Sequence, residues 1–223
     1  MAQGLTSVSR DRAVPRKVKP ADKWVARFAW NERFAHWWTV SMFLTALITG
    51  VIMGPDAESG PMMQAHIASV ILLGVGILLA LLGGPRRILR SMRQLFVFDR
   101  HDLAWLSERA RRPFAMKLHA QWGKFNLGQK LAAWAVSVSF SVLIYTGIRS
   151  YQTGNDLAGP HNTAVVVTVV LIGAHFVMAV INPSTRPALA GMVLGRVRRT
   201  WARKHHGAWL DELDRTTTSE TPQ

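Results

Sequence analysis

Four long stretches of the chain are apolar throughout and contain no Asp, Glu, Lys or Arg: residues 36–54, 62–84, 131–148 and 164–181. Each is close to the roughly 20 residues that a helix needs to cross a bilayer. A soluble helix of this length would show charged residues at every turn on its outer face. The pattern therefore predicts an all-α membrane protein built as a bundle of four transmembrane helices.

The distribution of charge predicts how the four spans are oriented. Lys and Arg number 27 against 13 Asp and Glu, and 26 of the 27 lie before the first span, between the second and third, or after the fourth. The short segments 55–61 and 150–160 contain no Lys or Arg. By the positive-inside rule, both termini and the long middle segment are cytoplasmic. The basic composition therefore reflects membrane topology, and we expect no nucleic acid as a partner.

The remaining segments divide the chain into a transmembrane domain and two tails. Residues 1–29 are basic and lack the apolar core of a signal peptide, so we expect a disordered cytoplasmic tail there. Residues 30–214 form the transmembrane domain, and 215–223 form a second disordered tail. Within the middle segment, residues 85–98 alternate arginines with apolar side chains. This cytoplasmic amphipathic segment suits either anionic lipid headgroups or a solvated helix.

Four of the eight histidines, His36, His66, His161 and His175, lie in or at the edge of a predicted span. The direction of the chain places His36 and His175 towards the cytoplasm, and His66 and His161 towards the outer face. The fourteen residues between His161 and His175 correspond to about 21 Å of helix rise, with both side chains pointing to nearly the same side. One helix can therefore supply a ligand to each of two stacked cofactors.

Two histidines on opposite sides of a haem iron fill both axial positions, which favours electron transfer. The chain has no cysteine, so any haem is noncovalent and of the b type. A zinc site would need a compact cluster, and an ion-coupled transporter would be expected to carry membrane-embedded carboxylates. Hydrogen bonding between helices is the simplest alternative for a single membrane histidine. The other histidines lie among cytoplasmic charges, where we expect them to be solvated: His101, His119, His205 and His206.

Two motifs resemble the gamma subunit (cytochrome b) of membrane-bound formate dehydrogenase: residues 123–130, Gly-Lys-Phe-Asn-Leu-Gly-Gln-Lys, and residues 191–206, with their glycines and Trp201. The resemblance covers roughly residues 30–214. It implies a subunit of the bacterial cytoplasmic membrane that binds two b-type haems and passes electrons to menaquinone or ubiquinone. It also implies an iron–sulfur beta subunit as donor and a molybdenum- or tungsten-dependent alpha subunit, on which formate oxidation itself takes place.

The same resemblance assigns roles to individual residues. His36 and His175 would bind the cytoplasmic-side haem, and His66 and His161 the outer one. Asn126 and Gly128 would belong to a quinone pocket beside His175, a role compatible with Asn126 capping the third span.

Two loops depart from the pattern of the family. The turn at residues 182–187 is longer than in well-known members, and the outer loop between His36 and His66 is shorter. Related cytochromes b serve nickel–iron hydrogenases and thiosulfate reductases, and small b561 proteins react with quinone alone, so these functions remain alternatives. A haem-free membrane anchor or a transporter represents a different class.

Overall fold

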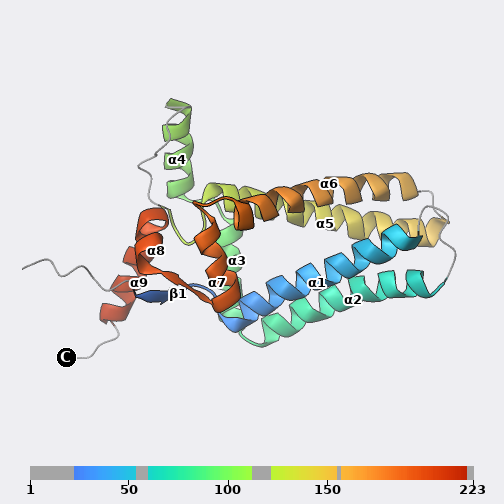
Figure 1. Cartoon of the computed structure of the whole chain (residues 1–223), viewed down its shortest axis with the longest axis horizontal. Helices are drawn as coiled ribbons and strands as arrows, with labels where there is room; N and C mark the ends of the chain where they lie inside the picture. The colour runs from blue at the N-terminus through green and yellow to red at the C-terminus, as the bar shows by residue number, and fades with distance from the viewer. Residues whose placement is uncertain (1–22, 54–59, 112–121, 155–156, 220–223) are drawn as a thin grey trace, which may run out of the picture.

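The computed structural model describes residues 23–53, 60–111, 122–154 and 157–219. Four long helices are apolar enough to cross a membrane: α1 (Trp30–Met53), α2 (Pro61–Leu82), α5 (Leu127–Thr153) and α6 (Ala158–Phe176) with its π-helical extension η1 (Val177–Ile181). They pack as two antiparallel hairpins, α1 against α2 and α5 against α6 (Figure 1). The predicted four-helix membrane bundle is confirmed. The helices extend beyond the predicted spans because polar residues at their ends continue the helix without being apolar.

Local signals in the sequence fix several helix ends. Pro61 opens α2, where a missing backbone N–H costs nothing. Asn126 caps α5 together with Gln129, and each side chain accepts a hydrogen bond from the backbone N–H of the other residue. Gly154 ends α5 with a positive φ of 68°, a conformation that favours glycine.

The outer surface of the bundle is apolar along its length. Only 6 to 17% of the residues in the most apolar window of each span are buried inside the protein. Leu, Ile and Val side chains are exposed along all four spans, for example Ile48, Leu79, Val138 and Val170. An apolar surface of this extent belongs in lipid.

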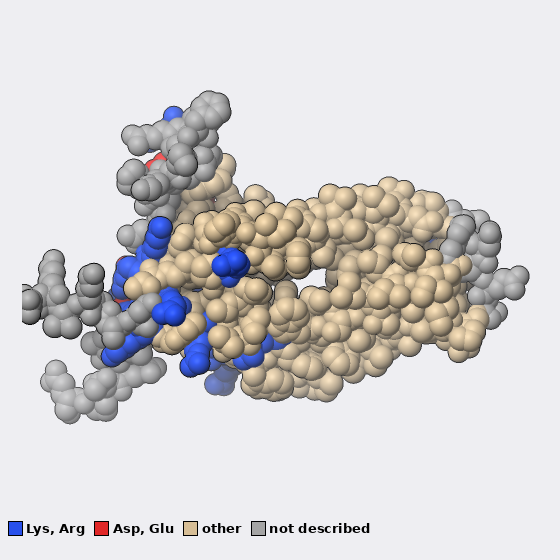
Figure 2. Space-filling model, in the orientation of Figure 1, with Lys and Arg blue, Asp and Glu red and all other residues tan. Residues whose placement is uncertain are grey.

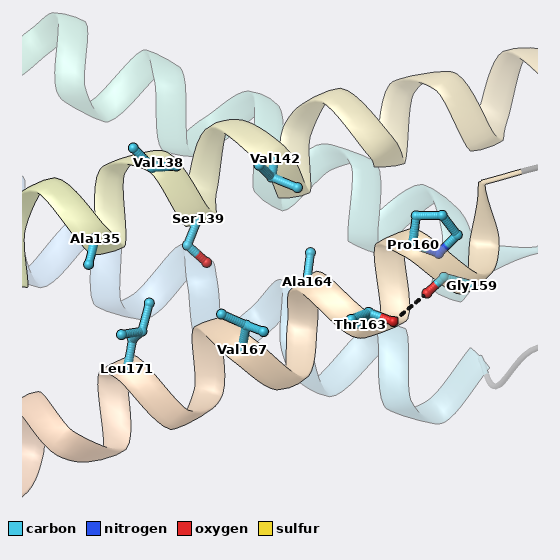
Figure 3. Close-up of a pocket in the computed structure, with 10 residues that line it drawn as sticks. All are labelled: Ala135, Val138, Ser139, Val142, Gly159, Pro160, Thr163, Ala164, Val167 and Leu171. Carbon is cyan, nitrogen blue, oxygen red and sulfur yellow. Dashed lines mark hydrogen bonds between the residues drawn. The ribbon is translucent and has the colours of Figure 1, made fainter.

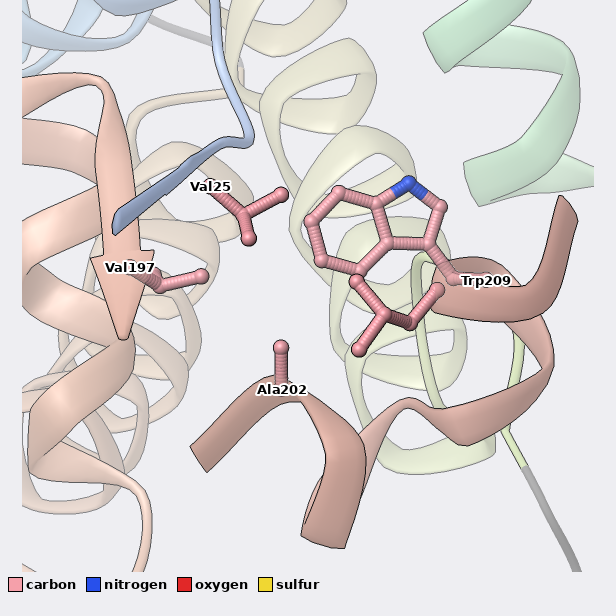
Figure 4. Packing of buried hydrophobic residues seen from close by; sticks show 5 residues of the cluster. Val25, Val197, Ala202 and Trp209 are labelled. Atoms are coloured by element: carbon pink, nitrogen blue, oxygen red, sulfur yellow. The ribbon is translucent and has the colours of Figure 1, made fainter. Parts of the chain in front are cut away.

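The remaining elements gather at one end of the bundle (Figure 1). They are β1 (Trp24–Ala26), α3 (Pro85–Phe96), α4 (Arg100–Arg111), η2 (Arg186–Ala188), α7 (Leu189–Leu194), β2 (Arg196–Arg198), α8 (Arg199–His205) and α9 (Gly207–Ser219). Strands β1 and β2 pair antiparallel, with Val25 opposite Val197. A small apolar core packs beside this sheet (Figure 4), formed by Val25, Val197, Ala202, Trp209 and Leu210.

This end unit corrects the predicted tails and one histidine. Residues 23–29, assigned to a disordered tail, include β1 and the buried Phe28, because β2 offers a pairing partner far away in the sequence. Helix α9 continues to Ser219, so part of the predicted tail 215–223 is helical. His206, expected to be solvated, is 1% exposed. Residues 1–22 and 220–223, and His119, lie outside the described part of the chain.

Candidate functional site

The four predicted histidines form two facing pairs inside the bundle. His36 of α1 faces His175 of α6, with 6.4 Å between ring centroids. His66 of α2 faces His161 of α6, with 6.3 Å between ring centroids. Each pair therefore joins one hairpin to the other, and α6 contributes to both pairs.

The spacing within each pair suits coordination of one metal ion from two sides. Metal–imidazole bonds measure about 2.0–2.1 Å, which places the centroids of two opposed imidazole rings roughly 6 to 6.5 Å apart. Among the described residues, no group of three or more His, Cys, Asp or Glu is arranged to hold a metal. Two ligands alone leave the equatorial positions to a macrocycle, so the residues present fit haem and do not fit a tetrahedral zinc site.

The two hairpins are not packed together along their whole length. The space-filling view shows an opening through the middle of the bundle (Figure 2). His175 is exposed although it lies within a long apolar helix, and His36, His66 and His161 are only half-buried. None of the four histidines is fully buried.

The outer pair is held by hydrogen bonds from neighbouring helices. His66 Nδ1 lies 2.9 Å from the Ala46 carbonyl oxygen and 3.4 Å from Thr49 Oγ1. His161 Nδ1 lies 3.0 Å from Thr146 Oγ1. Thr49 and Thr146 were not among the predicted site residues. A signal for them exists, because the first and third spans each contain a Thr-Gly pair near the outer end.

The inner pair has a different environment. The His36 ring packs edge-on against Trp37, with ring centroids 5.3 Å apart. Two residues after His175, at Val177, the helix widens into the π-helical turn η1, and such turns occur frequently at functional sites. Within the described ranges, no hydrogen bond reaches the ring nitrogens of His36 or His175.

The predicted quinone residues, Asn126 and Gly128, lie at the start of α5. Asn126 Oδ1 accepts a hydrogen bond from Gln129 N at 2.9 Å, so the capping role is present. The side-chain nitrogen of Asn126, Nδ2, makes no hydrogen bond within the described part of the chain, and Gly128 is exposed beside Asn126. No hydrogen bond there links either residue to His175.

A separate cavity of about 700 Å³ lies along the seam between α5 and α6 (Figure 3). Its lining consists of apolar and hydroxyl side chains, with Ser139 and Ala135 on α5 and Thr163 and Leu171 on α6. None of the four histidines lines it. It offers no iron ligand and no strong hydrogen-bond donor, so we assign no redox site to it.

Comparisons with known proteins agree with this geometry. A sequence model of the family described as prokaryotic cytochrome b561 matches residues 27–195. The chain is 24% identical to the cytochrome b556(Fdn) subunit of nitrate-inducible formate dehydrogenase from Escherichia coli K12, over 86% of this chain and 93% of the relative. It is also 24% identical to the cytochrome b556(fdo) subunit of formate dehydrogenase from the same organism, over 86% and 95%. A cytochrome b556 subunit from Haemophilus influenzae is 29% identical over 40% of this chain.

Proposed function

The chain belongs to the prokaryotic cytochrome b561 family, and from that premise we propose that it is the membrane electron-transfer subunit of a formate dehydrogenase-like complex. Its four apolar helices make it an integral membrane protein. The observation that carries the proposal is the pair of facing histidines at each end of the bundle, His36 with His175 and His66 with His161. Haem bound at these positions supplies one-electron transfer.

The protein's own contribution is to hold the two sites in one rigid frame. Both sites share α6, where fourteen residues separate His161 from His175 and set a rise of about 21 Å. Each hairpin supplies one ligand to each site, so the distance between opposed imidazoles depends on how the two hairpins are placed relative to each other.

We further propose that Asn126 and Gly128 contact a membrane quinone, either menaquinone or ubiquinone, at the inner end of the bundle. The side-chain amide of Asn126, which donates no hydrogen bond to the described residues, is a suitable donor for a quinone carbonyl oxygen, where negative charge develops during reduction. The exposed Gly128 leaves room for a flat ring beside that amide. An iron–sulfur subunit and a molybdenum- or tungsten-dependent subunit are the proposed partners, by analogy with the complexes named for the relatives.

The proposed orientation places both termini in the cytoplasm of a bacterial cell. Lys and Arg gather at the end of the bundle that carries α3, α7 and α8 (Figure 2), as the positive-inside rule requires of a cytoplasmic face. Helix α3 supports this orientation. It exposes Leu89 and Met92 beside Arg86, Arg90 and Arg93, an arrangement suited to the interface of an anionic leaflet.

The test is the haem content of the purified chain. A reduced-minus-oxidised spectrum should show b-type haem at two per chain, and His175→Ala and His66→Ala should each reduce the content to one. His101→Ala, on α4, is the matched control and should retain two. A purified, folded chain without haem would overturn the proposal. Copurification of iron–sulfur and molybdenum or tungsten subunits with a tagged chain would test the partners, and a nickel–iron subunit instead would reassign the complex.

A further inference from the structure

The hydrogen bond between His161 and Thr146 has a defined direction. Thr146 Oγ1 lies 2.7 Å from the Val142 carbonyl oxygen, which can only accept, so the single hydroxyl proton points there. The lone pairs of Thr146 Oγ1 then face His161 Nδ1 at 3.0 Å. His161 Nδ1–H is therefore the donor. The opposite nitrogen, Nε2, keeps its lone pair for iron.

The same logic applies to His66. Its Nδ1 lies 2.9 Å from the Ala46 carbonyl oxygen, which fixes the proton on Nδ1. Thr49 Oγ1 adds a longer acceptor at 3.4 Å, and its own proton is directed to the Thr45 carbonyl oxygen at 2.7 Å. Both ligands of the outer pair are thus held in the tautomer that coordinates through Nε2.

A glycine follows each threonine and lies against the same ring. A Cβ added at Gly50 would lie 3.3 Å from His66 Cε1, and a Cβ added at Gly147 would lie 3.3 Å from His161 Cε1. These distances are tighter than ordinary van der Waals contact. The same arrangement therefore occurs in both hairpins: a Thr-Gly pair on the first helix (α1 or α5) contacts the histidine on the second helix (α2 or α6).

The inner pair lacks this device. Neither His36 nor His175 has a hydrogen bond at a ring nitrogen within the described residues. A ligand that donates its second N–H to an acceptor becomes a stronger electron donor to its metal, which favours the oxidised state.

We propose that Thr49 and Thr146 act as positioning residues that lower the reduction potential of the outer haem below that of the inner haem. The inference rests on the proposed function, because it requires haem at both pairs. The potential difference directs electrons from the outer face of the bundle to the inner end, where Asn126 lies.

The test is a spectroelectrochemical titration of the purified chain carrying Thr146→Val or Thr49→Val. Valine has a methyl group in place of the threonine hydroxyl, so the side chain keeps its shape and loses the hydrogen-bond acceptor. His66→Ala first identifies the outer component by its absence. At a fixed potential, we expect the reduced-to-oxidised ratio of that component to rise up to about tenfold in Thr146→Val, a change equal to about 59 mV for a one-electron couple. Thr49→Val should shift it less, since its contact is longer and the Ala46 carbonyl remains.

Two further variants keep the test decisive. Thr45→Val is the matched control, because the Thr45 hydroxyl donates only to the Ser41 carbonyl one turn away from the site. It should leave both potentials unchanged. Thr146→Ser keeps the acceptor and should retain two haems at the original potentials, even where Thr146→Val lowers haem content.

The possible results of these experiments distinguish a failure of this inference from a failure of the proposed function. Two haems with unmoved potentials in Thr146→Val would overturn the inference alone, as would a shift confined to the inner component or a failure of Thr146→Ser to restore the original potential. Absence of haem from the unaltered chain would overturn the proposed function as well.

Discussion

Arg27 Nη2 donates a hydrogen bond to His206 Nε2 across 3.2 Å, although 179 positions separate the two residues. The direction is fixed because His206 Nδ1 donates to the Gly123 carbonyl oxygen at 2.8 Å, which leaves the lone pair on Nε2. Burial, followed by the charge of Arg27, lowers the pKa of His206 to about 3. Burial lowers the pKa of Arg27 to about 9, and its guanidinium lies over the rings of Trp201 and Trp209. At neutral pH a charged arginine is therefore held by a neutral histidine.

This contact predicts that the end unit loosens in acid. An exposed histidine has a pKa of about 6.5, so between roughly pH 6.5 and 3 the unfolded state holds a proton at His206 that the folded state lacks. The contribution of His206 to folding stability is therefore fully present above about pH 6.5, the pKa in the unfolded state, and it decreases as the pH is lowered through this range. Hydrogen-exchange protection of α8 and α9, corrected for intrinsic rates, should decrease from pH 7 to 4.

Substitutions separate His206 from other acid effects. His206→Gln removes the titrating group and should flatten the pH dependence, while it lowers protection at pH 7. His101→Gln, on α4, should retain the full dependence, because His101 has no contact with His206. Protection in the unaltered chain that is constant from pH 7 to 4 would contradict the assignment.

Lys130, in the first turn of α5, forms a buried ion pair that anchors α4. Its Nζ lies 2.5 Å from Asp102 Oδ2 and 2.9 Å from Asp99 Oδ2, and the side chains of Lys130 and Asp102 are 2% and 3% exposed. Lys130→Met would leave the Asp102 carboxylate buried without a cation, at a cost of roughly 3–5 kcal/mol. The denaturation midpoint in detergent should fall accordingly, and Lys130→Met with Asp102→Asn should recover much of the loss.

An exposed pair provides the comparison for Lys130. Arg203 and Asp211 form an ion pair with both side chains 49% exposed. Arg203→Gln should cost no more than about 1 kcal/mol, because water screens the pair. If Lys130→Met and Arg203→Gln lower the free energy of unfolding equally, burial does not make the Lys130 ion pair more important to stability than the exposed pair.

The sequence predicted what depends on local pattern and missed what depends on distant contacts. Hydropathy was sufficient for the four spans, and the direction of the chain through the spans predicted which histidines pair. Lys130 was placed outside the third span because it is charged, yet it is buried in the first turn of α5 because Asp102, 28 positions earlier, neutralises it. His206 follows Lys204 and His205 in a polar run, and only the folded chain shows that Arg27 and Gly123 enclose it. Thr146 carries no periodic signal within its apolar helix.

The proposed topology predicts which positions react with an impermeant thiol reagent in intact cells. The chain contains no cysteine, so single substitutions give an unambiguous readout. Gln152→Cys, at the end of α5 remote from the basic elements, should be labelled from outside, whereas Arg90→Cys on α3 should be labelled only after the membrane is opened. Labelling of Arg90→Cys in intact cells would reverse the orientation.

The side-chain oxygen and the side-chain nitrogen of Asn126 have different roles. Asn126 Oδ1 accepts a hydrogen bond from Gln129 N at 2.9 Å, and the Gln129 side chain accepts one from the backbone N–H of Asn126 at 3.1 Å, so the capping box does not use Nδ2. Serine is also an effective helix cap but lacks the amide donor, so Asn126→Ser should retain stability and haem content. The loss of one hydrogen bond, about 0.5–1.5 kcal/mol, should raise the KM for quinone by roughly 2- to 13-fold.

Gln129→Ala supplies the opposite separation for the same helix end. It removes half of the capping box and leaves the Asn126 amide in place, so it should lower the denaturation midpoint while the KM for quinone stays unchanged. A quinol analogue should perturb the haem spectrum in Gln129→Ala but less in Asn126→Ser at the same concentration. If Asn126→Ser reduces quinone with the KM of the unaltered chain, its amide takes no part in binding, and Asn126 has only the role of a helix cap.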